Sequence, residues 1–572
     1  MSLDLLFPHF ETLIRTPEDV ARLNQAILGL AVQGKLVPQD PADEPASELL
    51  KRIRAEKQRL VKEGKLEESK VSRRIEPAAM PYELPESWEW VRLGNLAESM
   101  SNGIYKPANF YDDDGVACLR MYNIQDGRIS FHDLKRMDLT GSEIATYGLR
   151  EGDLLVNRVN SRELVGKAAV IPVIRELLVY ESKNIRVRFL GELTEAHFIN
   201  VVFRTSMVKT EFEQSAKQTT GQASINQAQL NDLMVPLPPL AEQRRIVAKV
   251  ESLFAQTRAL EVKLRQARDD LVTVNRAALH RLSAATDAGA FAAAWATVRD
   301  AFDLLYDDPR NVVELRQAIL QLAVQGKLVP QDSADEPASE LLKRIRAERR
   351  RLVKEGKVRE EKAVPSARAD ELFHALPPGW TRVQLDAITL IRTGSTPRRG
   401  ESKYYENGDI PWITSSVTGA PFITQASEFI TEVALKETNC QIYPKHTLIV
   451  AMYGQGKTRG QVSELLIDAA TNQACAALVF HGIACEIRPY VKIFHQKNYR
   501  ELRSLAEGGA QPNLNIGKIK ATLIPLPPLA EQHRIVARVD QLMRLCDALE
   551  AGLARAEGAR RALTAAVLGG AA

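Results

Sequence analysis

The sequence lacks the features that mark membrane and secreted proteins. No apolar run approaches the roughly 18 residues that a membrane-spanning helix needs. The amino terminus shows no basic segment followed by an apolar stretch and a small-residue cleavage site, the pattern of a signal peptide. The five cysteines include no C-x-x-C pair and no metal-ligand spacing. We therefore expect a cytoplasmic protein whose thiols are free and buried.

Signatures of catalysis are missing as well. The chain has no N-P-P-[YF] or D-P-P-[YF] methyltransferase motif, no F-x-G-x-G and no H-E-x-x-H metal site. Residues 451–458 nearly spell a phosphate-binding loop, but Ala451 stands where that motif needs glycine and no acidic Walker-B strand is evident. An ATP-dependent enzyme is thus a disfavoured alternative. We predict no catalytic residue, no metal site and no cofactor in this chain.

Length and charge set only broad limits. A chain of 572 residues exceeds one ordinary domain, so we expect several. With 45% hydrophobic and 26% charged residues, it has the balance of a globular protein. The net charge of +4 is nearly balanced and does not decide whether the chain binds nucleic acid.

The chain is one unit written twice. Residues 25–65 and 317–357 differ at only four positions, at an offset of 292. Similarity then fades for roughly 130 residues and returns as VPLPPLAEQRRIVAKV at 235–250 against IPLPPLAEQHRIVARV at 524–539. Two near-identical frames therefore hold two dissimilar inserts.

The frames have the pattern of helices. After Pro239 and Pro528, which suit a helix start, apolar residues recur at alternating steps of four and three. This heptad stripe predicts a coiled-coil seam in each copy. Residues 47–61 form a shorter amphipathic helix. The stripe comprises Ile246, Val250, Leu253, Thr257, Leu260, Leu264, Ala267, Leu271, Val274 and Ala278, and in the second copy Ile535, Val539, Leu542, Cys546, Leu549, Leu553, Ala556, Leu563 and Val567.

The inserts have the pattern of mixed α/β domains. Short strands are expected within residues 115–129, 152–156 and 184–189 of the first insert. In the second insert they are expected at 409–413, 447–451 and 474–480. We divide the chain into a helical frame and linker (1–80), a first insert domain (81–238), a central helix with the second frame and linker (239–376), a second insert domain (377–527) and a C-terminal helix (528–572).

These motifs carry a family resemblance. The paired PLPPLAEQ-x-R-I-V boundaries and paired QAIL-x-LAVQGKLV helices are similar to those of type I restriction-modification specificity subunits. T-G-S-T-P with residues 408–412 and the segment 509–515 of the second insert support it. The first insert departs from the family's motifs: it has residues 101–107 (SNGIYKP) in place of T-G-S-T-P, and residues 221–226 (GQASIN) near its exit.

The resemblance implies a fold and a function. The fold class would be α+β: two α/β target-recognition domains joined by a duplicated helical frame that forms an antiparallel coiled coil. The chain would bind double-stranded DNA at an asymmetric, bipartite sequence, without catalysing a reaction itself. Two methyltransferase subunits would bring S-adenosylmethionine, and motor-nuclease subunits would bring ATP and Mg. Segments 13–37 and 305–329 are our preferred docking sites for the methyltransferases.

Two other interpretations stay open. The chain could serve a methyltransferase that has no nuclease partner. It could also be a coiled-coil protein-interaction scaffold whose two variable inserts bind proteins, because divergent inserts between matched frames favour variable ligands but not DNA alone.

Candidate DNA contacts are polar and basic side chains in insert loops, since Arg and Lys suit guanine and phosphate while Ser, Thr and Asn suit phosphate or bases. Gln222 and Gln511 occupy matched positions, as do Asn226 and Asn515, which argues for backbone support or phosphate contact. The candidates in the first insert are Lys106, Arg120, Asn123, Asn157, Arg158, Asn160, Arg162, Gln218, Thr219 and Gln222. Those in the second are Arg392, Ser395, Thr396, Arg398, Arg399, Lys403, Tyr453, Lys457, Arg459, Gln511 and Asn513.

Charge separates the two inserts. Residues 85–235 hold 17 Lys/Arg against 20 Asp/Glu, whereas residues 377–523 hold 16 against 12. A DNA-reading domain normally has a basic face. We therefore expect the first insert to segregate its charges, with the acidic run Asp112, Asp113 and Asp114 pointing away from the DNA.

Overall fold

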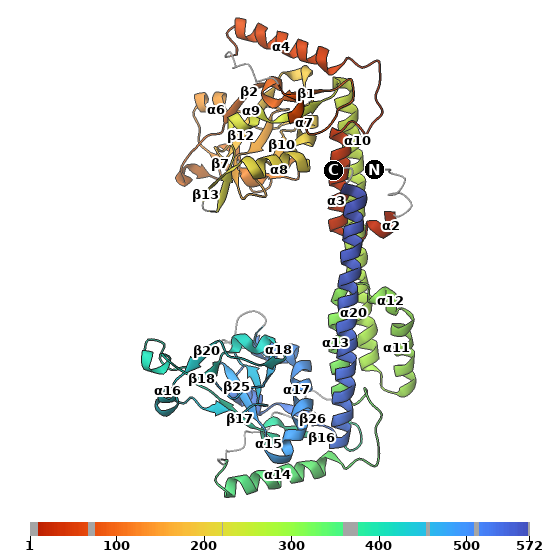
Figure 1. Cartoon of the computed structure of the whole chain (residues 1–572), viewed down its shortest axis with the longest axis vertical. Coiled ribbons are helices and arrows are strands. Elements are labelled where there is room, and N and C mark those ends of the chain that lie inside the picture. The colour runs from red at the N-terminus through yellow and green to blue at the C-terminus, as the bar shows by residue number, and fades with distance from the viewer. Residues whose placement is uncertain are drawn as a thin grey trace. The chain divides into compact units, whose positions relative to one another are not determined.

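The protein is represented by a computed structural model that describes residues 10–66, 75–219, 221–358, 376–453, 458–507 and 514–569. The chain divides into two compact units, Met1–Arg268 with Ala556–Ala572, and Asp269–Arg555. Each unit holds one insert and one copy of the frame (Figure 1). The two longest helices, α10 (Leu240–Ala284) and α20 (Leu529–Gly569), each begin in one unit and end in the other.

The frame of the first unit is built on α3 (Pro17–Val32) and α4 (Ala46–Lys62). A capping box starts α3: Thr16 Oγ1 accepts from Asp19 N at 3.3 Å, and the Asp19 carboxylate accepts from Thr16 N at 2.9 Å. The apolar face of α3 is buried against the start of α10 and against α7 (Ala196–Phe203) of the insert.

The second unit repeats this frame. Its helices are α13 (Pro309–Val324), capped by Asp308, and α14 (Ala338–Lys354). α13 packs against α17 (Arg488–Lys497) of the second insert. The apolar faces of α3 and α13 are thus covered within the chain, so our expectation of methyltransferase docking sites at 13–37 and 305–329 is wrong for those faces. The remaining frame helices are α2 (Phe10–Leu13), α11 (Ala288–Asp300) and α12 (Phe302–Leu305).

The seam of the long helices drifts from the predicted register. Ala267 and Val274 are exposed, and the fully buried Asn275 follows instead, with Leu279 behind it. In α20 the matched residues behave alike, because Leu563 is exposed and Thr564 is buried. A straight helix has 3.6 residues per turn and drifts about 20° per heptad, which moves the buried position by one residue after about four to five heptads.

The frames are fastened to the inserts by two matched clamps. Glu242, in the first PLPPLAEQ motif, accepts hydrogen bonds from Trp88 Nε1 at 2.9 Å and Gln39 Nε2 at 2.6 Å. Glu531 accepts the same bonds from Trp380 at 2.9 Å and Gln331 at 2.7 Å. The PLPPLAEQ motif therefore recurs because its glutamate makes the same pair of hydrogen bonds at the base of each insert.

The first insert contains two main sheets. Their strand orders are β10-β8-β12-β2 and β11-β4-β7-β3, and β13, β14 and β9 form a third, smaller sheet. Helices α7 and α8 (Ser206–Ser215) follow the strands, and α9 (Gln227–Asp232) leads to the exit. The strands are β1 Glu89–Arg92, β2 Ala97–Asn102, β3 Tyr111–Asp112, β4 Val116–Leu119, β5 Ile124–Gln125, β6 Arg128–Ile129, β7 Lys135–Met137, β8 Leu154–Asn157, β9 Val159–Asn160, β10 Ala168–Val170, β11 Leu178–Tyr180, β12 Asn184–Phe189, β13 Lys217–Thr219, β14 Gln222–Ser224 and β15 Met234–Leu237.

The second insert has a related plan despite its dissimilar sequence. Its sheets have the orders β17-β25-β22-β23-β19 and β20-β18-β24-β21. Helices α17, α18 (Tyr499–Glu507) and α19 (Ile516–Lys520) take the places of α7, α8 and α9. The strands are β16 Thr381–Gln384, β17 Leu390–Thr393, β18 Ile410–Ile413, β19 Phe422–Ile423, β20 Glu428–Ile430, β21 Ile442–Tyr443, β22 Leu448–Ala451, β23 Val462–Leu465, β24 Ala469–Thr471, β25 Cys475–Val479 and β26 Leu523–Leu526.

An antiparallel strand pair closes each insert at its base. β1 pairs with β15, and β16 pairs with β26, so the chain enters and leaves each insert side by side, directly before a long helix. Within each insert one parallel pair recurs, β4 with β11 and β18 with β24. The predicted fold class is confirmed: two α/β domains on a duplicated helical frame that forms an antiparallel coiled coil.

Across the described parts of the chain, no helix combines the length and apolar character that crossing a membrane requires.

Candidate nucleic-acid interface

A close backbone approach shapes the loop that leaves the first strand of the main sheet in both inserts. A Cβ on Gly103 would lie 2.3 Å from the carbonyl oxygens of Tyr180 and Glu181, and one on Gly394 would lie 1.6 Å from that of Thr471. Only glycine fits at such distances. SNGIYKP and TGSTP therefore differ in wording but share the glycine that holds these loops against the second sheet.

In the first insert this loop borders an open hollow of about 590 Å³. Tyr105, at its edge, is 79% exposed. Burial raises the pKa of Tyr111 to about 12, so its phenol stays neutral and can donate a hydrogen bond. The hollow is lined by Ile104, Tyr105, Lys106, Tyr111, Asp112, Asp113, Arg120, Lys135, Glu181, Ser182 and Lys183.

Two of the predicted contacts, Lys106 and Arg120, line this hollow. The Lys106 ammonium pairs with Glu143 at 2.6 Å. The Arg120 guanidinium pairs with Glu181 at 3.4 Å and stacks on Tyr122, 4.9 Å from the ring centroid. Both cations are held in place by internal partners and still face the opening.

The acidic run does not point away as we expected. Asp112 and Asp113 line the same hollow as Lys106 and Arg120, because β3 pairs with β7 at the edge of the second sheet. The charges of the first insert are thus mixed at this site, which corrects the expected segregation. A carboxylate at a DNA interface can accept from the amino group of cytosine, so a mixed hollow can still contact base edges.

Two predicted contacts are structural residues. Asn123 is buried, and its amide donates to the Ser130 carbonyl at 2.9 Å. Asn157 is also buried, and its amide donates to Asn184 Oδ1 at 3.1 Å. Neither amide reaches the surface, so we withdraw both as DNA contacts.

Their neighbours are more accessible. Asn160 donates to Asn157 Oδ1 at 2.8 Å and is half-buried. Arg158 donates to the Ser182 carbonyl at 3.4 Å, which places it beside the hollow, and Arg162 is exposed. For these three residues, contact with DNA remains a prediction.

A hairpin of β13 and β14 carries the remaining predicted residues of the first insert. Gln222 is exposed on it. Gln218 and Thr219 lie in β13, and their side chains are outside the described part of the structure. Beyond the hairpin, Asn226 caps α9 by accepting from Gln229 N at 3.0 Å.

The cap of α9 has a counterpart. Asn515 caps α19 by accepting from Lys518 N at 2.8 Å. Of the two shared roles that the sequence leaves open for the matched pair Asn226 and Asn515, the structure shows backbone support.

In the second insert, the loop after Gly394 is held by hydrogen bonds to side chains of the insert. The Ser395 carbonyl accepts from Trp412 Nε1 at 3.2 Å, and the Thr396 hydroxyl donates to Gln473. Arg399 stacks on Trp412, 5.0 Å from the ring centroid, and pairs with Glu428. The loop is thus fixed by its own side chains.

The cations of this loop differ in exposure. Arg398 is exposed, whereas Arg392 is half-buried. Lys403 pairs with Glu437 at 2.6 Å at the surface. The structure therefore brings Arg398, Arg399 and Lys403 to one loop region, while Arg392 lies below it on β17.

The sequence that resembles a phosphate-binding loop lies between strands β22, which ends at Ala451, and β23. Gly460 N donates to the Ala451 carbonyl at 2.9 Å, and β23 begins at Val462. No helix opens among the described residues after Thr458, as a phosphate-binding loop requires. Tyr453 and Arg459 flank this connection and are half-buried. The predicted contacts Lys457, Gln511 and Asn513 lie outside the described residues.

Of the residues that line the hollow, sequence reasoning predicted only Lys106 and Arg120 as contacts, and it missed Tyr105, Lys135 and Lys183 among others. Lys183 directly precedes the predicted strand at 184–189, so its place at a strand start was a usable signal. Lys135 gave no such signal, because it reaches the hollow only through the pairing of β7 with β3 and β4.

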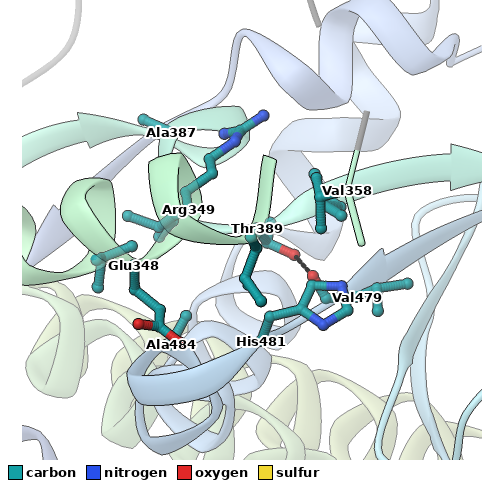
Figure 2. Close-up of a pocket in the computed structure, with 12 residues that line it drawn as sticks. Glu348, Arg349, Val358, Ala387, Thr389, Val479, His481 and Ala484 are labelled. Carbon is teal, nitrogen blue, oxygen red and sulfur yellow. Dashed lines mark hydrogen bonds between the residues drawn. The ribbon is translucent and has the colours of Figure 1, made fainter. Parts of the chain in front are cut away.

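A second cavity, of about 30 Å³, lies where α14 rests on the second insert (Figure 2). It has room for about one water molecule. Arg349 of α14 donates to the Asp386 carbonyl there, and Thr389 donates to the Val479 carbonyl at 2.8 Å. Burial lowers the pKa of His481 on its wall. This cavity is a packing seam between frame and insert.

The thiols are free, as expected, although Cys485 is exposed rather than buried. Burial raises the pKa of Cys118 and of Cys475 to about 12, which keeps these thiols protonated. Within the described ranges, no group of three or more His, Cys, Asp or Glu side chains could hold a metal ion.

Comparison with known proteins matches residues 85–267 and 377–556 to a family model described as the type I restriction modification DNA specificity domain. The chain is 29% identical over 544 residues to the type I restriction enzyme EcoAI specificity subunit of Escherichia coli, covering 93% of this chain and 90% of the relative. It is also 29% identical to the Escherichia coli EcoEI specificity subunit, covering 94% and 91%. A crystal structure of the HsdS subunit from Thermoanaerobacter tengcongensis aligns with 20% identity and a TM-score of 0.42 over 86% of this chain and 98% of that one.

Proposed function

The chain belongs to the family of type I restriction modification DNA specificity domains, and from this premise we propose that it supplies the sequence specificity of a type I restriction-modification complex. Each insert would read one half-site of an asymmetric, bipartite DNA sequence. The observation that carries this proposal is the contrast between the inserts: they share the order of the central strands, the clamps and a loop glycine, yet present different side chains at matched places.

The two interfaces support two different half-sites. The first insert offers Lys106, Arg120, Lys135 and Lys183 beside Asp112, Asp113 and Glu181. The second insert offers a more basic loop with Arg398, Arg399 and Lys403. Because each base pair presents a distinct donor and acceptor pattern in the major groove, different side chains imply different sequences.

Catalysis would reside in partner subunits. We propose that two methyltransferase subunits, carrying S-adenosylmethionine, bind the duplicated frame and modify adenines, and that motor-nuclease subunits use ATP and Mg. Base modification requires extrusion of the base into a catalytic pocket. We also propose that the complex acts in the cytoplasm.

Methylation mapping tests the proposal. The chain would be purified with its co-encoded methyltransferase subunit, supplied with S-adenosylmethionine, and used to methylate unmodified genomic DNA. We expect methylated adenines in a split motif with an unspecified spacer of fixed length. Lys106→Ala with Lys183→Ala should degrade one half of the motif, and Arg398→Ala with Lys403→Ala the other.

Two results would contradict the proposal. A continuous motif would mean that the inserts do not read separate half-sites. No methylation from an assembled complex would favour the scaffold interpretation. Gln58→Ala and Arg350→Ala, at exposed positions on α4 and α14, are matched controls that should leave the motif unchanged.

A further inference from the structure

The two copies of the frame are nearly identical from residue 25 onward and differ at most positions between residues 11 and 24. Beyond residue 25, α3 and its copy α13 are nearly identical. In their first turn, however, α3 carries Glu18 and Asp19 where α13 carries Arg310 and Asn311. α3 thus carries two carboxylates within its first turn, whereas α13 carries a carboxylate before its first turn, at Asp308, and a cation within it.

The helix ends beside them differ in the opposite sense. In the first unit α3 lies against the α20 end, residues 558–568, and in the second α13 lies against the α10 end, residues 269–279. The α20 end carries Arg560 and Arg561, whereas the α10 end has Leu271 and Val272 at the matched positions. The α10 end carries Asp269 where the α20 end has Gly558.

In the first unit the contact is a buried ion pair. Asp19 is fully buried, and the Arg560 guanidinium contacts its carboxylate. Arg560 also donates to the Leu13 carbonyl at 3.2 Å, as does the buried Thr564 hydroxyl at 3.2 Å. Arg560 thus compensates a charge and satisfies a backbone acceptor together.

In the second unit the positions of Asp19 and Arg560 are taken by the neutral residues Asn311 and Leu271. Asn311 is fully buried, and its amide donates to the Leu305 carbonyl, the counterpart of that of Leu13. Leu271, the counterpart of Arg560, packs against the apolar core. The Arg310 guanidinium pairs with the exposed Asp269 at 2.8 Å and with the buried N-cap carboxylate of Asp308 at 2.9 Å.

We propose that these residues form a pairing rule that assigns α3 to the α20 end and α13 to the α10 end. With α3 on the α10 end, Asp19 would be buried beside Leu271 and Glu18 would approach Asp269. With α13 on the α20 end, Arg560 would face Asn311 and Arg310 would approach Arg561. Each mismatch brings like charges together and removes the interhelical partner of Asp19 or Arg560, which leaves these buried ions only Arg22 or Glu557 of their own helix and is destabilising.

The rule has a consequence for assembly. Two copies of the N-terminal half, paired by their frames, would place α3 on an α10 end, and two copies of the C-terminal half would place α13 on an α20 end. Both are mismatched combinations. The frame therefore favours pairing of unlike halves, which keeps two different inserts together.

Residue exchange in the full chain tests the rule without changing composition or net charge. The first variant combines Asp19→Asn with Asn311→Asp, and the second combines Leu271→Arg with Arg560→Leu. Each should lower the midpoint of thermal unfolding by about 10 °C, because each buries unpaired charge in both units. The variant with all four substitutions exchanges the two matched combinations and should return to within about 2 °C of the parent.

The control exchanges another charge difference between the copies, Gln58→Arg with Arg350→Gln, at exposed positions of α4 and α14. It should not shift the midpoint. The proposal fails if the four-residue variant is as unstable as the sum of the two exchanges, or if either exchange alone leaves the midpoint unchanged.

Discussion

A buried imidazole couples the stability of the second unit to pH. His495 on α17 is fully buried, and neither ring nitrogen has a hydrogen-bond partner among the described residues. Burial lowers the pKa of His495 from 6.5 to about 4. Between pH 6.5 and pH 4 the imidazole of His495 is protonated in the unfolded chain and neutral in the folded protein. Stability is therefore complete above pH 6.5 and is lost as the pH falls toward 4.

Replacing this residue should flatten the pH dependence. We expect the free energy of unfolding of the parent to fall by about 1.4 kcal/mol per pH unit through this window, on account of His495 alone. His495→Phe should remove that slope, measured by urea unfolding at pH 7.5 and 5.5. His197→Gln, at an exposed position, should leave it intact. If the free energy of unfolding depended on pH equally in the parent and in His495→Phe, His495 would not be the cause of the pH dependence.

A single glycine should control the interface of the second insert. In Gly394→Ala the new Cβ would lie 1.6 Å from the Thr471 carbonyl oxygen, so the loop that carries Arg398 and Arg399 must move. Misplaced contacts cost about 1–3 kcal/mol each, so DNA affinity should fall about 10-fold or more.

The loss should be confined to one half-site. Fluorescence anisotropy with the assembled complex would show that altering the second half-site no longer matters for Gly394→Ala, while altering the first still does. Gly400→Ala is the control, because a Cβ on Gly400 meets no atom within 4 Å. Equal affinity of the parent and Gly394→Ala would show that this loop does not contact DNA.

At the scale of elements, the two clamps should be equivalent. Glu242→Ala would leave Trp88 Nε1 and Gln39 Nε2 without their acceptor, and Glu531→Ala would do the same to Trp380 and Gln331. An unsatisfied buried donor costs about 1–3 kcal/mol. We expect each substitution to lower the unfolding free energy of its own unit by a similar amount, read by hydrogen exchange in each insert. Unequal losses would show that the copies have diverged in this task.

Elements were more predictable than their surroundings. The helix starts after Pro239 and Pro528 and the strands at 184–189 and 409–413 are predicted from local patterns. They are confirmed, the last as Ile410–Ile413. The shift from Val274 to Asn275 depends on helix geometry accumulated over several turns, which a heptad template does not contain.

The candidate site was less predictable for a related reason. Asn123 and Asn157 have side chains that suit DNA contact and internal hydrogen bonding equally, so only tertiary packing distinguishes the two roles. Asp112 reaches the hollow because β3 pairs with β7, and that pairing joins residues far apart in sequence. At Gly394 the T-G-S-T-P motif marked a loop that the structure shows to be fixed by a close backbone approach, and DNA contact by that loop stays a prediction.

At the scale of the whole molecule, matched frames imply interchangeable inserts. Each insert is closed by its own strand pair, β1 with β15 or β16 with β26, and each is held by the same clamp. Specificity therefore belongs to the insert, and position belongs to the frame. An insert moved to the other frame would carry its half-site with it.

Placing the second insert in both frames tests this division. Residues 381–526 would replace residues 89–237, so that both frames carry the same reader. Because each half-site follows its reader and the two frames run antiparallel, the methylated motif should become a palindrome of the second half-site, with the spacer unchanged. Adenine mapping with the assembled complex would give both the half-sites and the spacer. A motif that keeps the first half-site would place specificity in the frame, and a new half-site at the first position would mean that frame and insert read DNA jointly.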